Sequence, residues 1–226
     1  MAATNAITGL FSGLPRHLSV LLFASAKPLK LAPNQVLFRA DDPGDGCYRV
    51  EKGLVKVSMV SPSGTERVIA ILGPGAIVGE LAVLDGLPRS ASVLALRECE
   101  LSFVSKTKFE ECADKHPELY RHLLMVLASR LRETNDVIAA ESFLPLRGRV
   151  ALTFIELAEH FGENVEGNRI IIRHKLGESD LAAMAGIARE NVEGILTDWQ
   201  NRKLISKESD YFCIENKSAL HQEIHL

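Results

Sequence analysis

Short runs of apolar or alternating residues fill the first half of the chain, and turn-forming residues separate them. From Pro28 to about Val104 the turn formers recur about every 8–12 residues, in APNQ, DDPGDG, SPSG, GPG and DGLP. Between them lie runs such as VLF, CYRVEKG, LVKVSMV, RVIAIL, SASVLAL and CELSFV. Many short strands at this spacing are typical of an all-β sandwich or jelly roll.

The pattern becomes helical after KHPEL, where Pro117 is suited to the first turn of a helix. Seam positions then recur at spacings of 4, 3, 4, 3 and 4, as in a coiled coil of about three heptads. They are Tyr120, Leu124, Leu127, Leu131, Thr134 and Ile138. The seam can pack on its own β domain or on a second copy of the chain. We favour the second copy, because so long a seam exceeds what a small domain can cover.

The last third of the chain combines helical and strand-like segments in a recognisable order. FLPLRG, residues 143–148, predicts a hinge, and RVALTFIELAEHFG predicts a helix with Gly162 as its C-cap. A strand RIIIRH follows, then the helical segments ESDLAAMAG and IARENVEGILTDWQNRKL, and then the strand-like runs LISK and YFCIE. Helix, turn, helix and hairpin in this order indicate a winged helix-turn-helix.

These elements together predict an α+β protein. Residues 1–117 are expected to form an N-terminal β-roll (jelly roll) that binds an effector. Residues 118–142 are expected to form a long dimerisation helix. Residues 143–226 are expected to form a winged helix-turn-helix that binds DNA.

Composition narrows the class of protein but not its function. The chain has 226 residues, 46% hydrophobic and 24% charged, which is ordinary for a globular protein. It has no apolar run of about 18 residues and no export signal at its start. We therefore expect a cytoplasmic protein that does not associate with a membrane. The four cysteines are scattered and the histidines lack metal-binding spacings. We therefore expect reduced thiols and no metal.

Charge gives no global indication of a nucleic-acid partner. The net charge is -3, and residues 146–226 carry 10 basic and 13 acidic residues. Any surface that binds DNA must therefore be a local patch of basic residues.

The stretch GELAVLDGLPRSASV carries the clearest chemistry. A helical turn at Gly79–Ala82 would direct unpaired backbone N–H groups at an anion. Arg89 then supplies a fixed cation, Ser90 a hydroxyl and Glu80 a pair of acceptor oxygens suited to a sugar hydroxyl. This set fits a small anionic ligand that contains a ribose.

Extended by one residue at its start, this stretch reads VGELAVLDGLPRSASV. It resembles the phosphate-binding cassette of cyclic-nucleotide-binding domains. The long helix, the hinge and ESDLAAMAGIARENVEGILTDWQNRKLIS resemble the cyclic-AMP receptor protein/FNR family of bacterial transcription regulators, over roughly residues 20–216. The resemblance implies that Glu80 bonds the ribose 2′-hydroxyl. It also implies that the cyclic phosphate is held by Arg89, by Ser90 and by the amide of Leu81 or Ala82.

The resemblance also assigns the base contact. Thr134 and Asn135 occupy the positions where a neighbouring Thr and Ser of the family contact adenine; the first matches and the second departs. Independently, Thr134 is a polar residue at a seam position and needs a partner, which is either the base edge or a residue across the dimer. The expected effector is cyclic AMP. Cyclic GMP is the second candidate, because an asparagine amide can serve adenine N6 or guanine O6.

In the second helix of the helix-turn-helix, Arg189 and Glu190 match the family's base-reading pair, and Asn191 belongs to the same predicted DNA-contacting set. Arginine is suited to guanine and glutamate to the amino group of cytosine; the alternative is a solvated surface pair. Gly194 stands where the family has a third reader, usually arginine, and costs the helix about 1 kcal/mol relative to alanine. Ala188 stands where serine or threonine would cap the helix.

We therefore expect a homodimeric, DNA-binding transcription regulator that is controlled by cyclic AMP, binds a pseudo-palindromic promoter site and works with RNA polymerase. An enzyme is disfavoured because the chain shows no nucleophile–base pair, P-loop or metal-binding spacing. Two alternatives remain open. The same fold can sense another ligand or none, or a cyclic-nucleotide-binding module can regulate a partner protein through an acidic C-terminal half.

Overall fold

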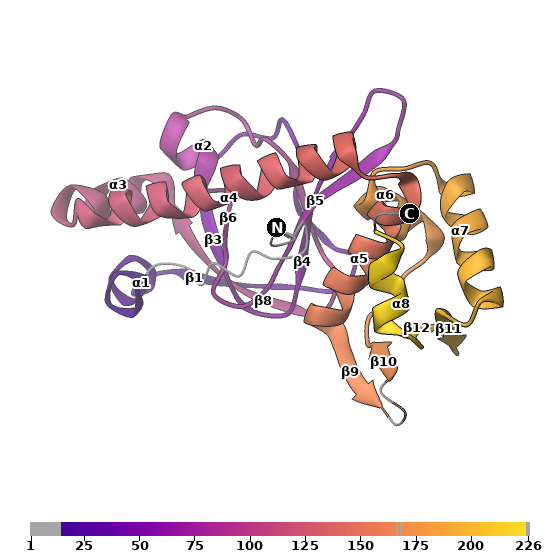
Figure 1. Cartoon of the computed structure of the whole chain (residues 1–226). Helices are drawn as coiled ribbons and strands as arrows, with labels where there is room; N and C mark the ends of the chain where they lie inside the picture. Colours follow the sequence, from indigo (N-terminus) through magenta and orange to yellow (C-terminus); the bar gives the residue numbers. More distant parts are fainter. Residues whose placement is uncertain (1–14, 166, 168, 225–226) are drawn as a thin grey trace. The chain divides into compact units, whose positions relative to one another are not determined.

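The computed structural model describes residues 15–165, 167 and 169–224, and these residues form two compact units (Figure 1). The first unit comprises the described residues up to Ser61 together with Val68–Glu133. The second unit contains Pro62–Arg67 and everything described from Thr134 onward. The boundary between them falls within one long helix. The limits predicted for a separate dimerisation segment, residues 118–142, stay a prediction.

The first unit is built on two four-stranded sheets, with strand orders β1-β8-β3-β6 and β2-β7-β4-β5. The pairs β1–β8, β3–β8, β3–β6, β2–β7 and β4–β7 are antiparallel. Its apolar core includes Val50, Val55, Val93 and Leu101, all at most 2% exposed. The predicted β-roll is therefore present. The strands are β1 (Lys27–Leu31), β2 (Val36–Phe38), β3 (Gly46–Lys52), β4 (Val55–Val60), β5 (Glu66–Leu72), β6 (Ile77–Val78), β7 (Ser92–Ala95) and β8 (Cys99–Ser105).

Helices pack against one end of this β-roll around a second apolar cluster, which includes Leu22, Phe109 and Leu119. The sequence analysis did not predict two of these helices, α1 and α3. In α3 only Phe109 and Ala113 are buried, so the helix carries too few apolar positions to show a clear period. The helices are α1 (Arg16–Phe23), α2 (Glu80–Asp85), α3 (Lys106–Lys115) and α4 (Glu118–Phe143).

The long helix α4 has two different apolar stripes. Leu119 and Leu123 are at most 2% exposed and pack into the cluster of the first unit. The predicted seam follows the other stripe, where Leu124, Leu131 and Ile138 are 65%, 63% and 55% exposed. The described part of the chain therefore leaves these three seam residues largely uncovered, whereas the seam residue Tyr120 contacts Phe109 edge-to-face.

The second unit contains the predicted helix, turn, helix and hairpin. Its sheet has the strand order β11-β12-β10-β9. In its core, Phe154 makes edge-to-face contacts with Trp199 and Phe212, with ring centroids 6.0 and 5.3 Å apart. The elements are α5 (Leu146–Phe161), β9 (Gly162–Val165), β10 (Arg169–Ile172), α6 (Glu178–Ala185), α7 (Arg189–Asn201), β11 (Ile205–Glu208), β12 (Tyr211–Ile214) and α8 (Lys217–Gln222).

The hinge predicted over residues 143–148 is shorter in the structure. Helix α4 ends at Phe143 and helix α5 begins at Leu146, so only Leu144 and Pro145 connect them. Gly148 lies within the first turns of α5 and its role is packing. A Cβ at Gly148 would lie 2.3 Å from the carbonyl oxygen of Ile224, so the close approach of the C-terminal segment requires glycine.

Gly162 also differs from its prediction. The helix does end at Phe161, but Gly162 has φ -78° and ψ 134°, which is extended backbone rather than the left-handed C-cap. The chain passes directly into β9, a strand that the sequence analysis did not predict. A Cβ at Gly162 would lie 2.1 Å from the carbonyl oxygen of Ala158, so this glycine also permits a close backbone approach.

Candidate ligand-binding and DNA-binding sites

The cassette begins with a sharp turn from β6 into the short helix α2. Gly79 precedes the helix with φ 78°, in the left-handed region that glycine adopts without strain. A Cβ there would also lie 2.4 Å from Nη1 of Arg89. Of the two residues predicted to supply an amide, Ala82 is buried and Leu81 is 38% exposed. Ser90 is exposed beside Arg89.

Arg89 is 3% exposed and is held through several contacts. Nη1 donates to the carbonyl oxygens of Gly46 and Gly79 at 2.7 and 2.8 Å, and Nη2 pairs with Asp45 at 2.8 Å. The backbone is fixed as well, because its N–H donates to the carbonyl oxygen of Asp42 at 2.9 Å. The sequence analysis missed Asp45, whose only signal was its place in the turn DDPGDG.

One polar atom of this guanidinium has no partner in the part of the chain that the structure describes. Nε of Arg89 is buried and lacks a hydrogen bond to any described residue. The guanidinium carbon lies 4.3 Å from the ring centroid of Phe38 and 5.9 Å from that of Tyr48, so aromatic rings cover it. Asp45, in contrast, is 67% exposed and occupies only the Nη2 side. A buried cationic N–H without an acceptor is suited to an anionic ligand.

Glu80 lies beside this arginine in the cassette, and its side chain is 4% exposed. Its Oε1 forms an ion pair with Nη1 of Arg130 on α4, and Nη2 of Arg130 donates to the carbonyl oxygen of Ile77 at 2.7 Å. The sequence analysis did not assign Arg130 to the site, because its contacts come from residues distant in the sequence. A carboxylate has two acceptor oxygens, so one ion pair leaves capacity for a sugar hydroxyl.

Cys47 forms part of the buried surroundings of the cassette and is 1% exposed. Burial, with a further contribution from Glu80, raises the pKa of the Cys47 thiol to about 12. The thiol is therefore protonated at neutral pH and behaves as a small apolar group.

Thr134 and Asn135, the predicted base contacts, are exposed on α4. Thr134 follows Arg130 by four residues, so both side chains lie on the same face of the helix, one turn apart. The two residues belong to the second unit and the cassette belongs to the first. Their contact with a base remains a proposal.

The candidate DNA-binding face is the exposed side of α7. The opposite side of the helix is buried through Val192, Ile195 and Trp199. The four predicted DNA-contacting residues are exposed. Helix α6 ends at Ala185, and Gly186 caps it with φ 63° in the turn between the two helices. Ala188 occupies the N-cap of α7 without a side-chain hydrogen bond, as its residue type predicts. The exposed set is Arg189, Glu190, Asn191 and Gly194.

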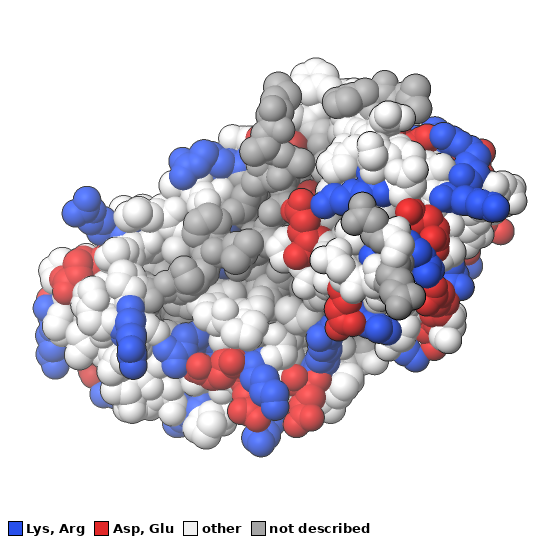
Figure 2. All heavy atoms as spheres, turned by 60° about the horizontal axis from the view of Figure 1, so that its bottom comes forward, with Lys and Arg blue, Asp and Glu red and all other residues white. Residues whose placement is uncertain are grey.

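Gly194 has open space around it, because a Cβ there would meet no atom within 4 Å. Neither packing nor backbone geometry requires glycine at this position of α7. Arg189 is the only basic side chain among the four predicted contacts, and it pairs with Glu178 of α6 at 3.1 Å. On the face displayed in Figure 2, basic and acidic side chains are interspersed in the area that is described. A DNA interface here therefore depends on individual side chains.

Comparison with known proteins identifies the two domains that contain these candidate sites. The family description Cyclic nucleotide-binding domain matches residues 28–116, and Crp-like helix-turn-helix domain matches residues 148–223. A CRP-like cAMP-activated global transcriptional regulator of Mycobacterium tuberculosis is 31% identical over 212 residues, 94% of each chain. A cyclic AMP receptor protein of Thermus thermophilus is 34% identical over 160 residues, 71% of this chain and 70% of its own.

The chain belongs to the cyclic-AMP receptor protein/FNR family of transcription regulators. It is accordingly a regulator with a cyclic-nucleotide-binding domain and a DNA-binding helix-turn-helix. Solved structures of the family share the fold at lower identity. A c-di-GMP-responsive global regulator of Xanthomonas campestris aligns with a TM-score of 0.80 at 19% identity, over 89% of this chain and 100% of its own.

A second structural relative, a CRP-family regulator of Thermus thermophilus, aligns with a TM-score of 0.74 at 22% identity, over 87% of this chain and 96% of its own. The matched relatives are transcriptional regulators and the matched domains are binding domains. Among the residues that the structure describes, no helix is long and apolar enough to span a bilayer.

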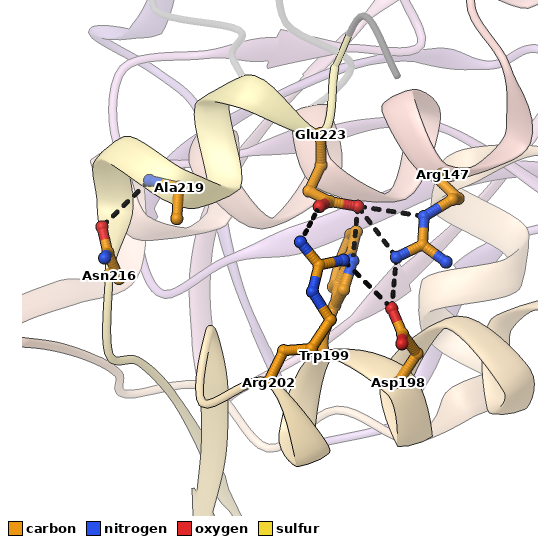
Figure 3. Close-up of polar contacts among 7 residues, drawn as sticks. All are labelled: Arg147, Asp198, Trp199, Arg202, Asn216, Ala219 and Glu223. Carbon is orange, nitrogen blue, oxygen red and sulfur yellow. Dashed lines mark hydrogen bonds and ion pairs between the residues drawn. The ribbon is translucent and has the colours of Figure 1, made fainter.

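A buried carboxylate near the C-terminus, that of Glu223, contacts side chains of α5, of α7 and of the residue that follows α7 (Figure 3). Glu223 is 1% exposed; its Oε2 accepts from Nε1 of Trp199 and from Nε of Arg147, each at 2.9 Å. Its Oε1 lies 2.7 Å from Nη2 of Arg202 as an ion pair, without the direction of a good hydrogen bond. Burial opposes ionisation, but these partners outweigh it and lower the pKa of Glu223. The cluster joins the start of α5 to the end of α7.

An acidic cluster at the hairpin of β11 and β12 is neutralised by an arginine side chain. Glu208, Cys213 and Glu215 lie close enough together to resemble a metal site. Arg169 binds both carboxylates, with Nε 2.7 Å from Oε2 of Glu215 and Nη2 paired with Glu208. Burial raises the pKa of the Cys213 thiol, which disfavours a metal-binding thiolate. These contacts make the cluster a structural ion-pair network.

Proposed function

We propose that this chain is a homodimeric transcription regulator that binds cyclic AMP in its β-roll and a pseudo-palindromic promoter site through α7. The observation that carries the ligand proposal is the buried guanidinium of Arg89. Its Nε lacks an acceptor among the described residues, while its other two nitrogens are held in place. A cyclic phosphate supplies that acceptor. Family membership and a cAMP-activated relative with 31% identity support the choice of a cyclic nucleotide.

The proposed ligand contacts follow from the chemistry of each group. Arg89 and Ser90, with an amide of Leu81 or Ala82, bind the cyclic phosphate, and Glu80 accepts from the ribose 2′-hydroxyl. Arg130 holds the Glu80 carboxylate in position through their ion pair. Burial around Arg89 strengthens its charge–charge interaction with the phosphate, because water screens it less.

The choice between nucleotides rests on Thr134 and Asn135, because ribose and phosphate are common to all candidates. A threonine hydroxyl can accept from the adenine amino group, and an asparagine amide can accept from adenine N6 or donate to guanine O6. We therefore propose cyclic AMP as the preferred effector, with weaker discrimination against cyclic GMP than a Thr-Ser pair would give.

The ligand proposal is tested by calorimetry of cyclic AMP and cyclic GMP binding to the full chain. Arg89→Leu removes the charge-assisted contact to phosphate, worth about 1.5–3 kcal/mol, so affinity should fall roughly 10- to 150-fold. Arg97→Leu removes the same charge from an exposed position and should leave affinity unchanged. Equal affinities for Arg89→Leu and the unsubstituted chain would exclude this pocket.

The dimer proposal rests on the exposed seam of α4. Tyr120, Leu124, Leu131 and Ile138 repeat at heptad spacing and remain 39–65% exposed in a single chain. Leu124→Glu with Leu131→Glu should give a monomer in sedimentation experiments. Val20→Glu changes an apolar side chain of similar exposure, 60%, on α1 and should leave the dimer intact. A monomeric unsubstituted chain at micromolar concentration with ligand contradicts the proposal.

A two-fold dimer would place two α7 helices in successive major grooves, with half-sites about 34–36 Å apart. Arg189 is proposed to read guanine and Glu190 cytosine, with Asn191 beside them. Because Gly194 has no side chain, the half-site should be shorter than one read by three side chains, and Gly194→Arg should lengthen it. Arg189→Ala should cost about 1–3 kcal/mol on the best site and relax one base position in a selection experiment.

We further propose that the protein binds its promoter site next to RNA polymerase. We also propose that it acts in the cytoplasm. In vitro transcription from the selected site, with and without cyclic AMP, measures this step. The alternatives are separated by two further measurements. Affinity for DNA that falls steeply with salt indicates a DNA-binding regulator rather than a partner-binding module. A melting temperature that does not respond to cyclic AMP indicates that the fold senses another ligand.

A further inference from the structure

Glu178 and Arg189 hold each other across the turn of the helix-turn-helix. Glu178 is the first residue of α6 and Arg189 is the first residue of α7. Oε2 of Glu178 accepts from Nε of Arg189 at 3.2 Å and from Nη2 at 3.1 Å. The side chain of Arg189 remains 63% exposed, whereas that of Glu178 is 35% exposed. The base-reading arginine therefore has a defined position before any DNA is present.

The contact uses one edge of the guanidinium and leaves the other edge available. Glu178 binds the edge formed by Nε and Nη2. The opposite edge, formed by Nη1 and the second hydrogen of Nη2, keeps two parallel donors. Two parallel donors match O6 and N7 of guanine, which form the commonest specific contact in the major groove. The ion pair is thus compatible with guanine recognition.

From this geometry we infer that Glu178 is a positioning residue that orients Arg189 for guanine and thereby sets the specificity of the DNA-binding face. The inference rests on the proposed DNA-binding function of α7. An arginine side chain loses much rotamer freedom when it is fixed, so fixing it in advance lowers the entropy lost on binding. The gain is largest where the bound arginine keeps the same orientation.

Glu178 itself stands on a fixed support. The adjoining backbone N–H of Gly177 donates to Oδ2 of Asp180 at 2.8 Å, which closes the first turn of α6. Leu181 and Met184 anchor the helix in the core of the second unit, at 0% and 5% exposure. The carboxylate can therefore direct the arginine instead of following it.

The surrounding charges favour discrimination over general affinity. Glu190 and Glu193 are exposed on α7 near Arg189, and together with Glu178 they give the face more acidic than basic groups. Carboxylates are repelled by phosphates, so sequence-independent binding is weakened. An unpaired Arg189 would have more freedom to reach a phosphate, and Glu178 disfavours that alternative.

The test compares duplexes that differ at one position. A selected site is prepared with each of the four bases at the position whose preference Arg189→Ala removes, and binding is followed by fluorescence anisotropy with cyclic AMP present. Glu178→Gln should reduce the preference for guanine roughly two- to fivefold, the range of an exposed ion pair. Affinity for the other three duplexes should stay the same or rise. Glu178→Asp should restore part of the preference.

Glu193→Gln is the matched control, because it removes one negative charge from the exposed face of α7 at a residue that forms no described ion pair. It should change affinity for all four duplexes alike and leave the guanine preference intact. In the Arg189→Ala background, Glu178→Gln should change the preference no further. Thermal melting of each variant shows that its fold is retained.

The outcomes separate this inference from the proposed function. A full guanine preference in Glu178→Gln, with the preference lost in Arg189→Ala, overturns the role of Glu178 alone. An unchanged preference in Arg189→Ala overturns the reading role of Arg189 and this inference with it. An unsubstituted chain that selects no DNA sequence contradicts the proposed function itself.

Discussion

Each unit of the chain has a buried cluster of arginine and carboxylate groups, but the two clusters are completed differently. In the β-roll the buried group is the cation Arg89, whose Nε lacks an acceptor among the described residues. In the helix-turn-helix unit the buried group is the anion Glu223, which is surrounded by Arg147, Arg202 and Trp199. Both lie within reach of opposite charges, so burial of charge alone does not distinguish them.

The difference lies in whether each buried polar atom faces a partner of opposite charge. Glu223 has a cation or donor at both oxygens, so the cluster stabilises the fold by itself. Arg89 keeps a buried donor that has no acceptor among the described residues. A binding site and a structural cluster can therefore contain the same residue types.

Glu223→Ala should lower the free energy of unfolding of the second unit by about 3 kcal/mol, because two arginines and an indole N–H lose a buried acceptor. Trp199 is the only tryptophan, so its fluorescence during urea denaturation reports this unit. Asp210→Ala removes an exposed carboxylate that pairs with Lys175 and should change stability little. Equal losses in both variants would contradict the assignment of Glu223 as a structural anchor.

Arg89→Leu should behave in the opposite way. Its free energy of unfolding without ligand should change by less than about 1 kcal/mol, because the lost contacts are offset by removal of a buried charge. What it should lose is stabilisation by cyclic AMP, which amounts to about 2.7 kcal/mol at a ligand concentration 100 times the Kd. Thermal melting with and without nucleotide measures both effects. Retained stabilisation by the nucleotide would show that Arg89 is not the phosphate ligand.

Glu156 is a third buried charge, 5% exposed on α5, and burial together with Glu159 raises its pKa to about 7. A folded-state pKa above the unfolded value means that the protonated form stabilises the fold. That stability is fully present below about pH 4.5 and is lost as the pH rises to about 7. The stability advantage of Glu156→Gln over the unsubstituted chain should therefore grow by about 2–3 kcal/mol between pH 5 and pH 8. A constant difference across this range in urea denaturation contradicts the shift.

Asn135→Ser should have the smallest effect, because Asn135 is exposed and acts through one neutral hydrogen bond. Such a bond is worth about 0.5–1.5 kcal/mol, so the ratio of cyclic AMP to cyclic GMP affinity should rise by no more than about tenfold. Calorimetry with both nucleotides gives the ratio. If the substitution leaves it unchanged, Asn135 does not contact the base.

Much of the fold was predictable because each part has its own local pattern. Turn residues at regular intervals marked the strands of the β-roll, and a heptad repeat marked α4. The missed elements lacked such a signal: α3 buries only two residues, and β9 follows α5 without a turn. The hinge was placed too broadly because Gly148 resembles a flexible residue in sequence, whereas in the structure it contacts Ile224.

Local sequence determined the order of elements and the chemical identity of the cassette, since GELAVLDGLPRSASV contains a left-handed glycine, an acid and an arginine within one short segment. Tertiary structure alone decided which charges meet. Asp45 lies 44 residues from Arg89, and Arg130 lies 50 residues from Glu80. Periodicity reports which face of an element is buried, but the pairing of side chains from distant elements depends on how those elements pack. The unsatisfied Nε of Arg89 is a property of that packing.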